Sequence, residues 1–373
     1  MEIINQRLID KFVDLINQIS NSDKVAIFYD PDGDGTCSVV MLQKALERLN
    51  KNIAFISNEF HGSFNIGEDT VNKLKEKKIT HIFTLDLPVD YNADNFKFLE
   101  DFKTIIIDHH ILQNVNHPHN IFLIKPQLFT NMKEPNYYCT SKLVYDLMLR
   151  LVDINDLKWL AITGLISDYC WKDWDEFLRE GLKQYKVKWK DYLYDTDFGM
   201  LTKLITAASA FKDNRKSINE CKNFLYESNN LEEALKKCKK FNVVNKVVDD
   251  YILNFSQRAE RYNNACLLIL ELDEPYSITS SISTAVSTSG KFPNTFILVA
   301  QKNDERIHIS ARIQHSWDAN KILKECIKGF KEANAGGHVP ASGASMKKED
   351  YQTFKERLIK SVNESTRLKV KNQ

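Results

Sequence analysis

The triplet Asp108-His109-His110 offers a carboxylate and two imidazoles at one point of the chain. It comes directly after the apolar, β-branched run 104–107, which predicts a buried strand. In open α/β sheets, ligands bind at the edge where the strands end. The triplet therefore indicates metal-ligand chemistry at the carboxyl edge of a sheet.

A second group of carboxylates follows the apolar run 24–29, where Asp30, Asp32 and Asp34 alternate with proline and glycine. Carboxylates this close repel one another and raise each other's pKa unless strong positive charge draws them together. The spacing also opens an EF-hand, but that motif begins with a helix and needs a glutamate where this chain has Met41. The loop therefore favours a different kind of metal site.

Two further aspartates accompany apolar segments: Asp86 ends an apolar strand that begins at 81, and Asp168 lies on or at the end of the helix-like segment 156–170. Taken alone, Asp86 could cap the next helix and Asp168 could be an ordinary surface residue. All the carboxylates together with a histidine predict a hard or borderline ion such as Mn²⁺ or Mg²⁺ rather than structural zinc. They are numerous enough for two ions that share a bridging aspartate, activate water and clamp a phosphoryl group.

The elements that must position these residues follow an α/β pattern. Strand-like and helix-like segments alternate over 24–125, which predicts a mostly parallel sheet with helices on both faces. Helical periodicity dominates 137–262, and strand patterns return after 265. We expect a catalytic domain over 1–230 with a helical annex, a connecting helix over 231–262, and a smaller α/β domain over 263–373 across a cleft.

Composition excludes several classes. The 373 residues carry a formal net charge of +1, whereas proteins that grip long duplexes carry a strong basic excess, so we expect any nucleic-acid contact to be local. No apolar run is long enough to span a bilayer, and the N-terminus predicts an amphipathic helix rather than a signal peptide. The seven cysteines lack zinc spacing and predict reduced core residues. We expect a cytoplasmic protein that does not bind membranes.

A candidate phosphate site lies near the C-terminus, in the glycine-rich segment 334–345. Gly336, Gly337, His338 and Ser342 supply backbone N–H groups, an imidazole and a hydroxyl, and we expect them in a loop that binds substrate. Arg312 lies in an alternating strand pattern over 307–313 and could bind phosphate bidentately. The alternatives are an ordinary glycine turn and an arginine that faces solvent.

These motifs resemble the DHH phosphoesterase superfamily, which includes RecJ-type exonucleases, nano-RNA and cyclic-dinucleotide phosphodiesterases and family II pyrophosphatases. The resemblance spans nearly the whole chain: D-P-D-G-D-G, L-D-L, D-H-H and G-L-I-S-D match the family's four motifs. The segment G-G-H-V-P-A-S-G is similar to the signature of the DHH-associated C-terminal domain.

The resemblance implies a role for each matching residue. Asp108 would orient His109, and His110 would lie near the scissile phosphate. Several small-molecule branches have a histidine at the position of Phe28, whereas Asp30 matches the RecJ-like loop, which favours the nuclease branch. Arg312 and His338 would neutralise charge on phosphorus. The implied metal ligands are Asp32, Asp34, Asp86 (bridging), His109 and Asp168, with Asp30 as a further candidate.

We therefore expect an exonuclease or phosphodiesterase that uses two Mn²⁺ ions, with Mg²⁺ or Co²⁺ as substitutes, to degrade single-stranded DNA or RNA oligonucleotides. The alternative substrates are a cyclic dinucleotide, a 3′,5′-bisphosphate nucleotide or pyrophosphate. A third reading is a non-catalytic replication or repair scaffold, but such a protein would have lost acidic ligands that this chain keeps. Replication or repair proteins are further candidate partners, and no feature predicts the oligomeric state or the polarity of degradation.

The segment 169–195 interleaves tyrosines and tryptophans with lysines. Such a mixture can stack and hold single-stranded bases, but the pattern favours core packing of helical aromatics. His117 and His119 have metal-like spacing but lie in a polar loop without acidic neighbours, so we expect them at the surface.

Overall fold

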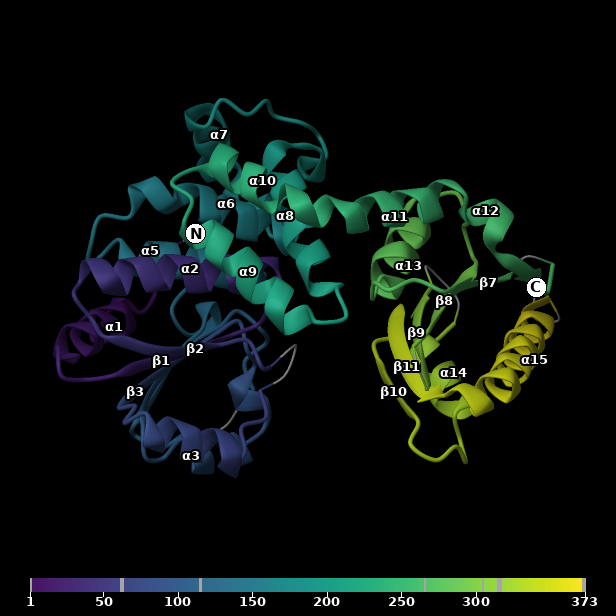
Figure 1. Ribbon diagram of the computed structural model, residues 1–373, viewed down its shortest axis with the longest axis horizontal. Helices are drawn as coiled ribbons and strands as arrows, with labels where there is room; N and C mark the ends of the chain where they lie inside the picture. The colour runs from purple at the N-terminus through teal and green to yellow at the C-terminus, as the bar shows by residue number, and fades with distance from the viewer. Residues whose placement is uncertain are drawn as a thin grey trace. The chain divides into compact units, whose positions relative to one another are not determined.

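Five short apolar strands form a parallel sheet in the N-terminal half of the chain, in the order β2-β1-β3-β4-β5 (Figure 1). The computed structural model describes residues 2–60, 64–113, 116–264, 266–303, 305–313 and 317–370. The predicted α/β class and parallel sheet are confirmed. The strands are β1 Val25–Tyr29, β2 Ile53–Ser57, β3 His81–Leu85, β4 Lys103–Ile107 and β5 Ile121–Ile124.

Helices cover both faces of this sheet, as Figure 1 shows for α2 and α3. One face carries a core that includes Phe28 on β1 and Val71 and Leu74 on α3. The ring of Phe28 lies 5.4 Å from that of Phe60 within an aromatic group, so it belongs to the core. The helices up to β5 are α1 Gln6–Gln18, α2 Gly33–Arg48, α3 Glu68–Glu76 and α4 Asp94–Phe98.

The strand register places Asp30, Asp86 and Asp108 at neighbouring strand ends. Tyr29 pairs with Leu85, and Leu85 pairs with Ile107, so β1, β3 and β4 end level with one another. The ladder continues one residue further, because the amides of Asp30 and Asp86 donate to the carbonyls of Leu85 and Ile107 at 3.2 and 3.1 Å. The carboxyl edge is therefore the acidic edge.

A helical layer follows β5 and packs partly on α2. α2 contacts both α5 and α6. α5 begins next to the acidic edge, and α6 ends next to it. The helices are α5 Thr140–Met148, α6 Lys158–Ser167, α7 Asp175–Gln184, α8 Asp197–Ser209, α9 Asn214–Tyr226, α10 Leu231–Cys238, α11 Asn242–Leu253 and α12 Phe255–Arg258.

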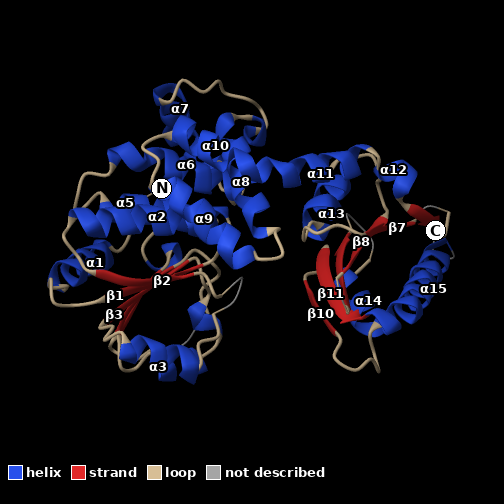
Figure 2. Cartoon of the chain, in the orientation of Figure 1, coloured by secondary structure: helices blue, strands red, loops and turns tan. Residues whose placement is uncertain are grey.

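The C-terminal part forms a second sheet (Figure 2). Its strand order is β10-β11-β9-β8-β7-β6, and among these pairs β7 and β8 are parallel while the others are antiparallel. α13 contacts β8 and β9, and its Ser283 faces Ser310 of β9, while α14 and α15 pack on the opposite, apolar face. The elements are β6 Glu260–Tyr262, β7 Leu267–Leu272, α13 Thr279–Thr288, β8 Phe296–Lys302, β9 Arg306–Arg312, α14 Ala319–Cys326, β10 Asn334–Gly337, β11 Ala341–Lys347 and α15 Tyr351–Val370.

Two sequence-based expectations differ from the structure. The segment 231–262 contains α10, a 3-10 turn, α11, α12 and β6 rather than one helix, because the turn buries Phe241 fully. The segment 334–345, expected as a loop, forms most of the hairpin of β10 and β11, because its small residues pair with β9.

The chain divides into two compact units. The first comprises Met1–Ser209 and Asp213–Asn242, and the second Ala210–Lys212 and Val243–Gln373. Within the described ranges, no helix has the length and apolar character needed to cross a membrane.

Candidate metal centre and phosphate site

Asp34 is held by the N-terminus of α5. Its Oδ2 accepts the Thr140 amide at 2.7 Å, and its Oδ1 accepts the Ser141 amide at 2.9 Å. The helix dipole stabilises a carboxylate there, and each oxygen keeps a second lone pair for a metal ion. Gly164 of α6 permits this packing, because a Cβ at that position would lie 1.9 Å from Ser141 Oγ and 2.7 Å from Asp34 Oδ1.

Asp32 has a structural role as well as a candidate chemical one. It is the N-cap of α2, and its Oδ1 accepts the Gly35 amide at 2.8 Å. Asp30 is buried beside it, since its charge helps to raise the pKa of Asp32. The loop predicted to concentrate carboxylates therefore does so.

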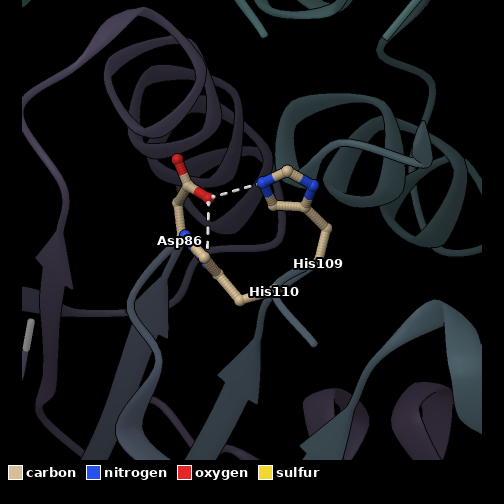
Figure 3. Close-up of side chains that lie close together, drawn as sticks. All are labelled: Asp86, His109 and His110. Atoms are coloured by element: carbon tan, nitrogen blue, oxygen red, sulfur yellow. Dashed lines mark ion pairs between the residues drawn. The ribbon is translucent and has the colours of Figure 1, made fainter. Parts of the chain in front are cut away.

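Asp86 reaches the cluster from a left-handed backbone, with φ of 59°. Aspartate tolerates this conformation better than most residues, but it still costs energy and is characteristic of functional sites. Asp86 Oδ1 accepts the Thr140 hydroxyl at 3.1 Å and lies 3.3 Å from His109 Nε2 (Figure 3). The alternative that Asp86 only caps a helix does not account for these contacts.

His109 joins the sheet edge to α6. Its Nδ1 donates to the Asn136 carbonyl at 2.6 Å, which points Nε2 toward Asp86 at 3.3 Å and toward Asp168 Oδ2 at 3.1 Å. Asp168 is therefore part of the cluster rather than an unrelated surface residue. Burial alone would lower the pKa of His109, but the two carboxylates raise it well above its usual value.

The electrostatics of the carboxylates call for more positive charge. Burial, followed by repulsion from neighbouring aspartates, raises the pKa of Asp32 well above its usual value and that of Asp34 to about 7. Burial also raises the pKa of Asp86, although His109 counteracts it. A proton on His109 supplies one positive charge, and divalent cations would supply more. Oxygen and imidazole donors suit Mn²⁺ or Mg²⁺, so the residues fit such ions.

Cys170 is a neighbour that the sequence reasoning missed. Its sulfur belongs with His109 and Asp168 to a group whose candidate ligand atoms lie within 4.8 Å of one another. Burial raises the pKa of this thiol well above its usual range, and Sγ contacts the Asp168 carbonyl at 3.3 Å. Cys170 therefore lies at the edge of the cluster, beside His109 and Asp168.

Asp108 orients His110, which corrects the expectation that it orients His109. His110 Nδ1 lies 2.7 Å from Asp108 Oδ1, and the His110 amide donates to the same oxygen at 3.2 Å. This tight turn over two residues occupies Oδ1, while the backbone of Asn136 orients His109. The side chain of His110 is 36% exposed, so within the described part of the chain its Nε2 is the imidazole nitrogen left for a substrate.

Lys125 holds Asp108 in place, and it was not identified from the sequence. Its Nζ lies 2.8 Å from Asp108 Oδ2 and 2.7 Å from Asp90 Oδ1, and all three side chains are almost completely buried. Lys125 directly follows β5, at the same edge as the aspartates. A charged residue after an apolar strand was the signal that could have found it.

In the second unit, Arg312 is surrounded by neutral oxygens. Its Nε and Nη2 donate to Thr284 Oγ1 and Ser280 Oγ of α13, at 3.1 and 3.0 Å, and Nη1 donates to Ser310 Oγ at 3.1 Å. Among the residues that the structure describes, no carboxylate forms an ion pair with Arg312. A half-buried guanidinium among hydroxyls can bind an anion.

The hairpin of β10 and β11 places the remaining predicted residues near Arg312, which pairs with Ala341. Gly337 has φ of 135°, and a Cβ there would lie 2.5 Å from the Ala341 carbonyl, so this turn needs glycine. His338 is exposed at the turn. Ser342 is 3% exposed and donates to the Gly336 carbonyl at 2.6 Å, so its hydroxyl is structural rather than substrate-binding.

Comparison with known families matches two parts of the chain. Residues 24–166 match the DHH family, N-terminal domain, and residues 266–364 match the DHHA1 domain. The two matches contain the DHH triplet and the Gly-Gly-His hairpin respectively. Comparison with curated protein sequences gave no match.

Solved structures share the fold at low sequence identity. RecJ from Thermus thermophilus in complex with Mn²⁺ is 16% identical, with a TM-score of 0.68 over 95% of this chain, which spans 55% of that protein's length. An exonuclease RecJ bound to manganese is 16% identical, with a TM-score of 0.67 over 97% of this chain and 95% of the other. A pGpG-specific phosphodiesterase, PggH, from Vibrio cholerae is 16% identical, with a TM-score of 0.51 over 92% of this chain and 100% of the other.

Removing the buried lysine should destabilise the first unit strongly. Lys125→Met leaves Asp108 and Asp90 buried without their shared cation, so we expect a loss of about 3–5 kcal/mol in the free energy of unfolding, measured by chemical denaturation. Lys97→Met removes an exposed pair with Asp94 and should change stability little. Equal effects of the two substitutions would contradict the role of Lys125.

The repelling carboxylates predict how Mn²⁺ stabilises the protein at different pH. The pKa of Asp34 is about 7 in the folded chain and about 3.9 in an unfolded one. The folded, metal-free chain therefore keeps a proton on Asp34 that the unfolded chain has released, and the free energy of unfolding falls as pH rises through about 7. His109, whose pKa is also raised, acts in the same direction. Mn²⁺ needs deprotonated carboxylates and relieves their repulsion.

We expect Mn²⁺ to raise the thermal unfolding midpoint more at about pH 8 than at about pH 5.5, in a scan of protein with Mn²⁺ against protein with EDTA. A shift of the same size at both pH values would show that these carboxylates do not bind the ion.

Proposed function

Because the chain belongs to the DHH phosphoesterase superfamily, we propose that it is a Mn²⁺-dependent phosphodiesterase that hydrolyses single-stranded or short oligonucleotides to nucleotides. One observation carries this proposal: His109 joins Asp86 and Asp168 at the acidic edge where Asp32 and Asp34 repel one another. A cluster of this kind suits divalent ions and has no evident use in a purely structural protein.

The proposed ligands are Asp32, Asp34, Asp86, His109 and Asp168, with Asp30 as a further candidate. Two bound ions would lower the pKa of a water molecule and neutralise phosphoryl oxygens during in-line displacement. Mn²⁺ fits a site with both carboxylates and an imidazole, and Mg²⁺ or Co²⁺ would substitute.

The chain's own groups bind and orient the substrate. Asp108 and Lys125 hold His110, whose exposed Nε2 would donate a hydrogen bond to a phosphate oxygen. Arg312 and His338, with the hairpin backbone at Gly336 and Gly337, would hold a second phosphate of the substrate. The hydrogen bond from His110 would stabilise negative charge that grows on phosphorus in the transition state.

A small phosphoester is the second candidate substrate. The similarity in fold to a pGpG-specific phosphodiesterase that this chain spans over its full length favours a dinucleotide within this class. The near-neutral charge of the chain also suits a short substrate. Oligonucleotides and dinucleotides would use the same metal centre.

In the decisive assay, the purified protein is incubated with Mn²⁺ or with EDTA. The substrates are end-labelled single-stranded DNA and RNA, in a series of lengths that begins with the dinucleotide. Linear pGpG, cyclic dinucleotides, a 3′,5′-bisphosphate nucleotide and pyrophosphate are tested in parallel. Release of mononucleotides from oligonucleotides would support the proposal. Turnover of the small molecules alone would instead favour a small phosphoester as the substrate.

Asp86→Asn should abolish turnover of every substrate while the fold survives. Asparagine tolerates the left-handed backbone and can still accept the Thr140 hydroxyl, but it lacks the charge that a bridging ligand needs. The measurement is initial rate together with circular dichroism. Asp94→Asn changes an exposed side chain of α4, so it is the matched control and should keep full activity. Retention of activity in Asp86→Asn would refute the metal centre.

Arg312→Ala should lower kcat/KM about tenfold or more, because it removes charge-assisted hydrogen bonds to phosphate. Arg306 lies on the same strand and the same face but binds Ser345 and the Glu332 carbonyl, so Arg306→Ala is the matched control and should leave kcat/KM unchanged. If both variants behaved alike, Arg312 would have no specific role in substrate binding.

A further inference from the structure

Three tyrosine rings stack directly beside the metal centre. The rings of Tyr169 and Tyr194 are 4.8 Å apart and inclined by 23°, and those of Tyr194 and Tyr192 are 5.6 Å apart and inclined by 21°. Trp171 lies 5.2 Å from Tyr169. We refer to Tyr169, Trp171, Tyr192 and Tyr194 as the aromatic stack; all four belong to the first unit.

The stack is exposed at its outer rings, which core packing does not explain. Tyr169 is 49% exposed and Tyr192 is 48% exposed, while Tyr194 between them is largely covered. A core cluster would bury its rings together. The sequence favoured internal packing of these aromatics, whereas the exposure of Tyr169 and Tyr192 favours a ligand.

The backbone holds Tyr169 in a conformation that usually requires glycine. α6 ends in a Schellman motif, in which the Tyr169 amide donates to the Ile166 carbonyl and the Cys170 amide to the Leu165 carbonyl. Tyr169 occupies the left-handed position with φ of 57°. A bulky residue there is strained, and glycine would relieve the strain. Lys78 and Lys186 occupy the same left-handed position at the ends of α3 and α7, so the backbone fixes where Tyr169 lies and its exposure carries the argument.

Two connections join the stack to the metal centre. Tyr169 directly follows Asp168, whose Oδ2 lies 3.1 Å from His109 Nε2. The Tyr194 hydroxyl donates to the carbonyl of Ser167, the residue before Asp168, at 2.8 Å. The stack and the candidate ligand are thus parts of one turn, and a ligand seated on Tyr169 lies next to the site of phosphate hydrolysis.

We propose that Tyr169 and the aromatic stack form a subsite for a nucleobase of the substrate, next to the phosphate that is cleaved. This proposal rests on the proposed phosphodiesterase function and names the part of the substrate that the first unit recognises. A flat base matches an exposed ring, and every base has a π-face, so the subsite accepts all four bases. A protein partner fits less well, because it would cover the metal centre.

The test is a double cycle between the ring and the base. Binding of a short single-stranded oligonucleotide is measured by fluorescence anisotropy with Ca²⁺, and a gel confirms that the strand stays intact. The protein is wild type, Tyr169→Gly or Tyr169→Phe. The oligonucleotide carries an abasic residue at each position in turn.

Tyr169→Gly should weaken binding of the complete oligonucleotide about tenfold, whereas Tyr169→Phe keeps the ring and should bind like wild type. At one position of the strand, an abasic residue should also weaken binding to the wild-type protein about tenfold. The same abasic residue should not weaken binding to Tyr169→Gly any further. Trp189→Ala is the control, since Trp189 is exposed in the same unit but packs on Arg179 outside the stack. Equal loss for complete and abasic strands at every position would overturn the proposal.

Folding of the variant is favoured, because glycine suits the left-handed position, and thermal unfolding verifies it. If Tyr169→Gly unfolded early, Tyr192→Leu would test the other exposed ring in the same cycle, with the same expected loss. The proposed function is judged separately by hydrolysis with Mn²⁺. Base-dependent binding without hydrolysis would refute the phosphodiesterase alone, and hydrolysis without base-dependent binding would refute the subsite alone.

Discussion

Mutual repulsion among buried aspartates is the constraint on which the rest of this structure depends. Parallel strands of equal length end at one edge, so the fold brings Asp30, Asp86 and Asp108 together whether or not their charges favour it. Burial and repulsion raise the pKa of Asp34 to about 7, which means that the folded chain holds these groups against an electrostatic penalty. The hydrophobic packing of the sheet and α2 must supply the free energy that maintains them.

Groups of different kinds offset the electrostatic cost of burying these aspartates. The amides at the N-terminus of α5 stabilise Asp34 without adding a charge, whereas Lys125 neutralises Asp108 with a full one. Burial alone would raise the pKa of Asp108, but the His110 hydrogen bond and the charge of Lys125 hold it well below its usual range. Asp108 therefore stays ionised and orients His110, while the carboxylates around His109 retain affinity for cations.

The sequence predicts the first sheet and its acidic edge well, because β-branched runs mark strands and parallel strands share an edge. It predicts the hairpin over 334–347 poorly, since glycine, alanine and serine carry little strand preference and form strands there by pairing with β9. The partner of Asp108 was also misjudged, because a turn over two residues decides it. Lys125 reaches Asp90 over 35 positions, a contact that no local pattern encodes.

The hydroxyls around Arg312 have a consequence for the kinetics of substrate capture. A long side chain usually loses rotamer freedom when it binds, at a cost of about 0.5–1.5 kcal/mol. Ser280, Thr284 and Ser310 already restrict this guanidinium, so most of that entropy was lost when the unit folded. The hydroxyls of Ser280 and Thr284 still carry their own protons, made stronger donors by the adjacent charge, whereas Ser310 Oγ already shares a hydrogen bond with Ser283 Oγ at 2.9 Å. In the proposed phosphate site, an arriving phosphate would therefore meet a preorganised group of donors, which would slow its release more than it speeds its arrival.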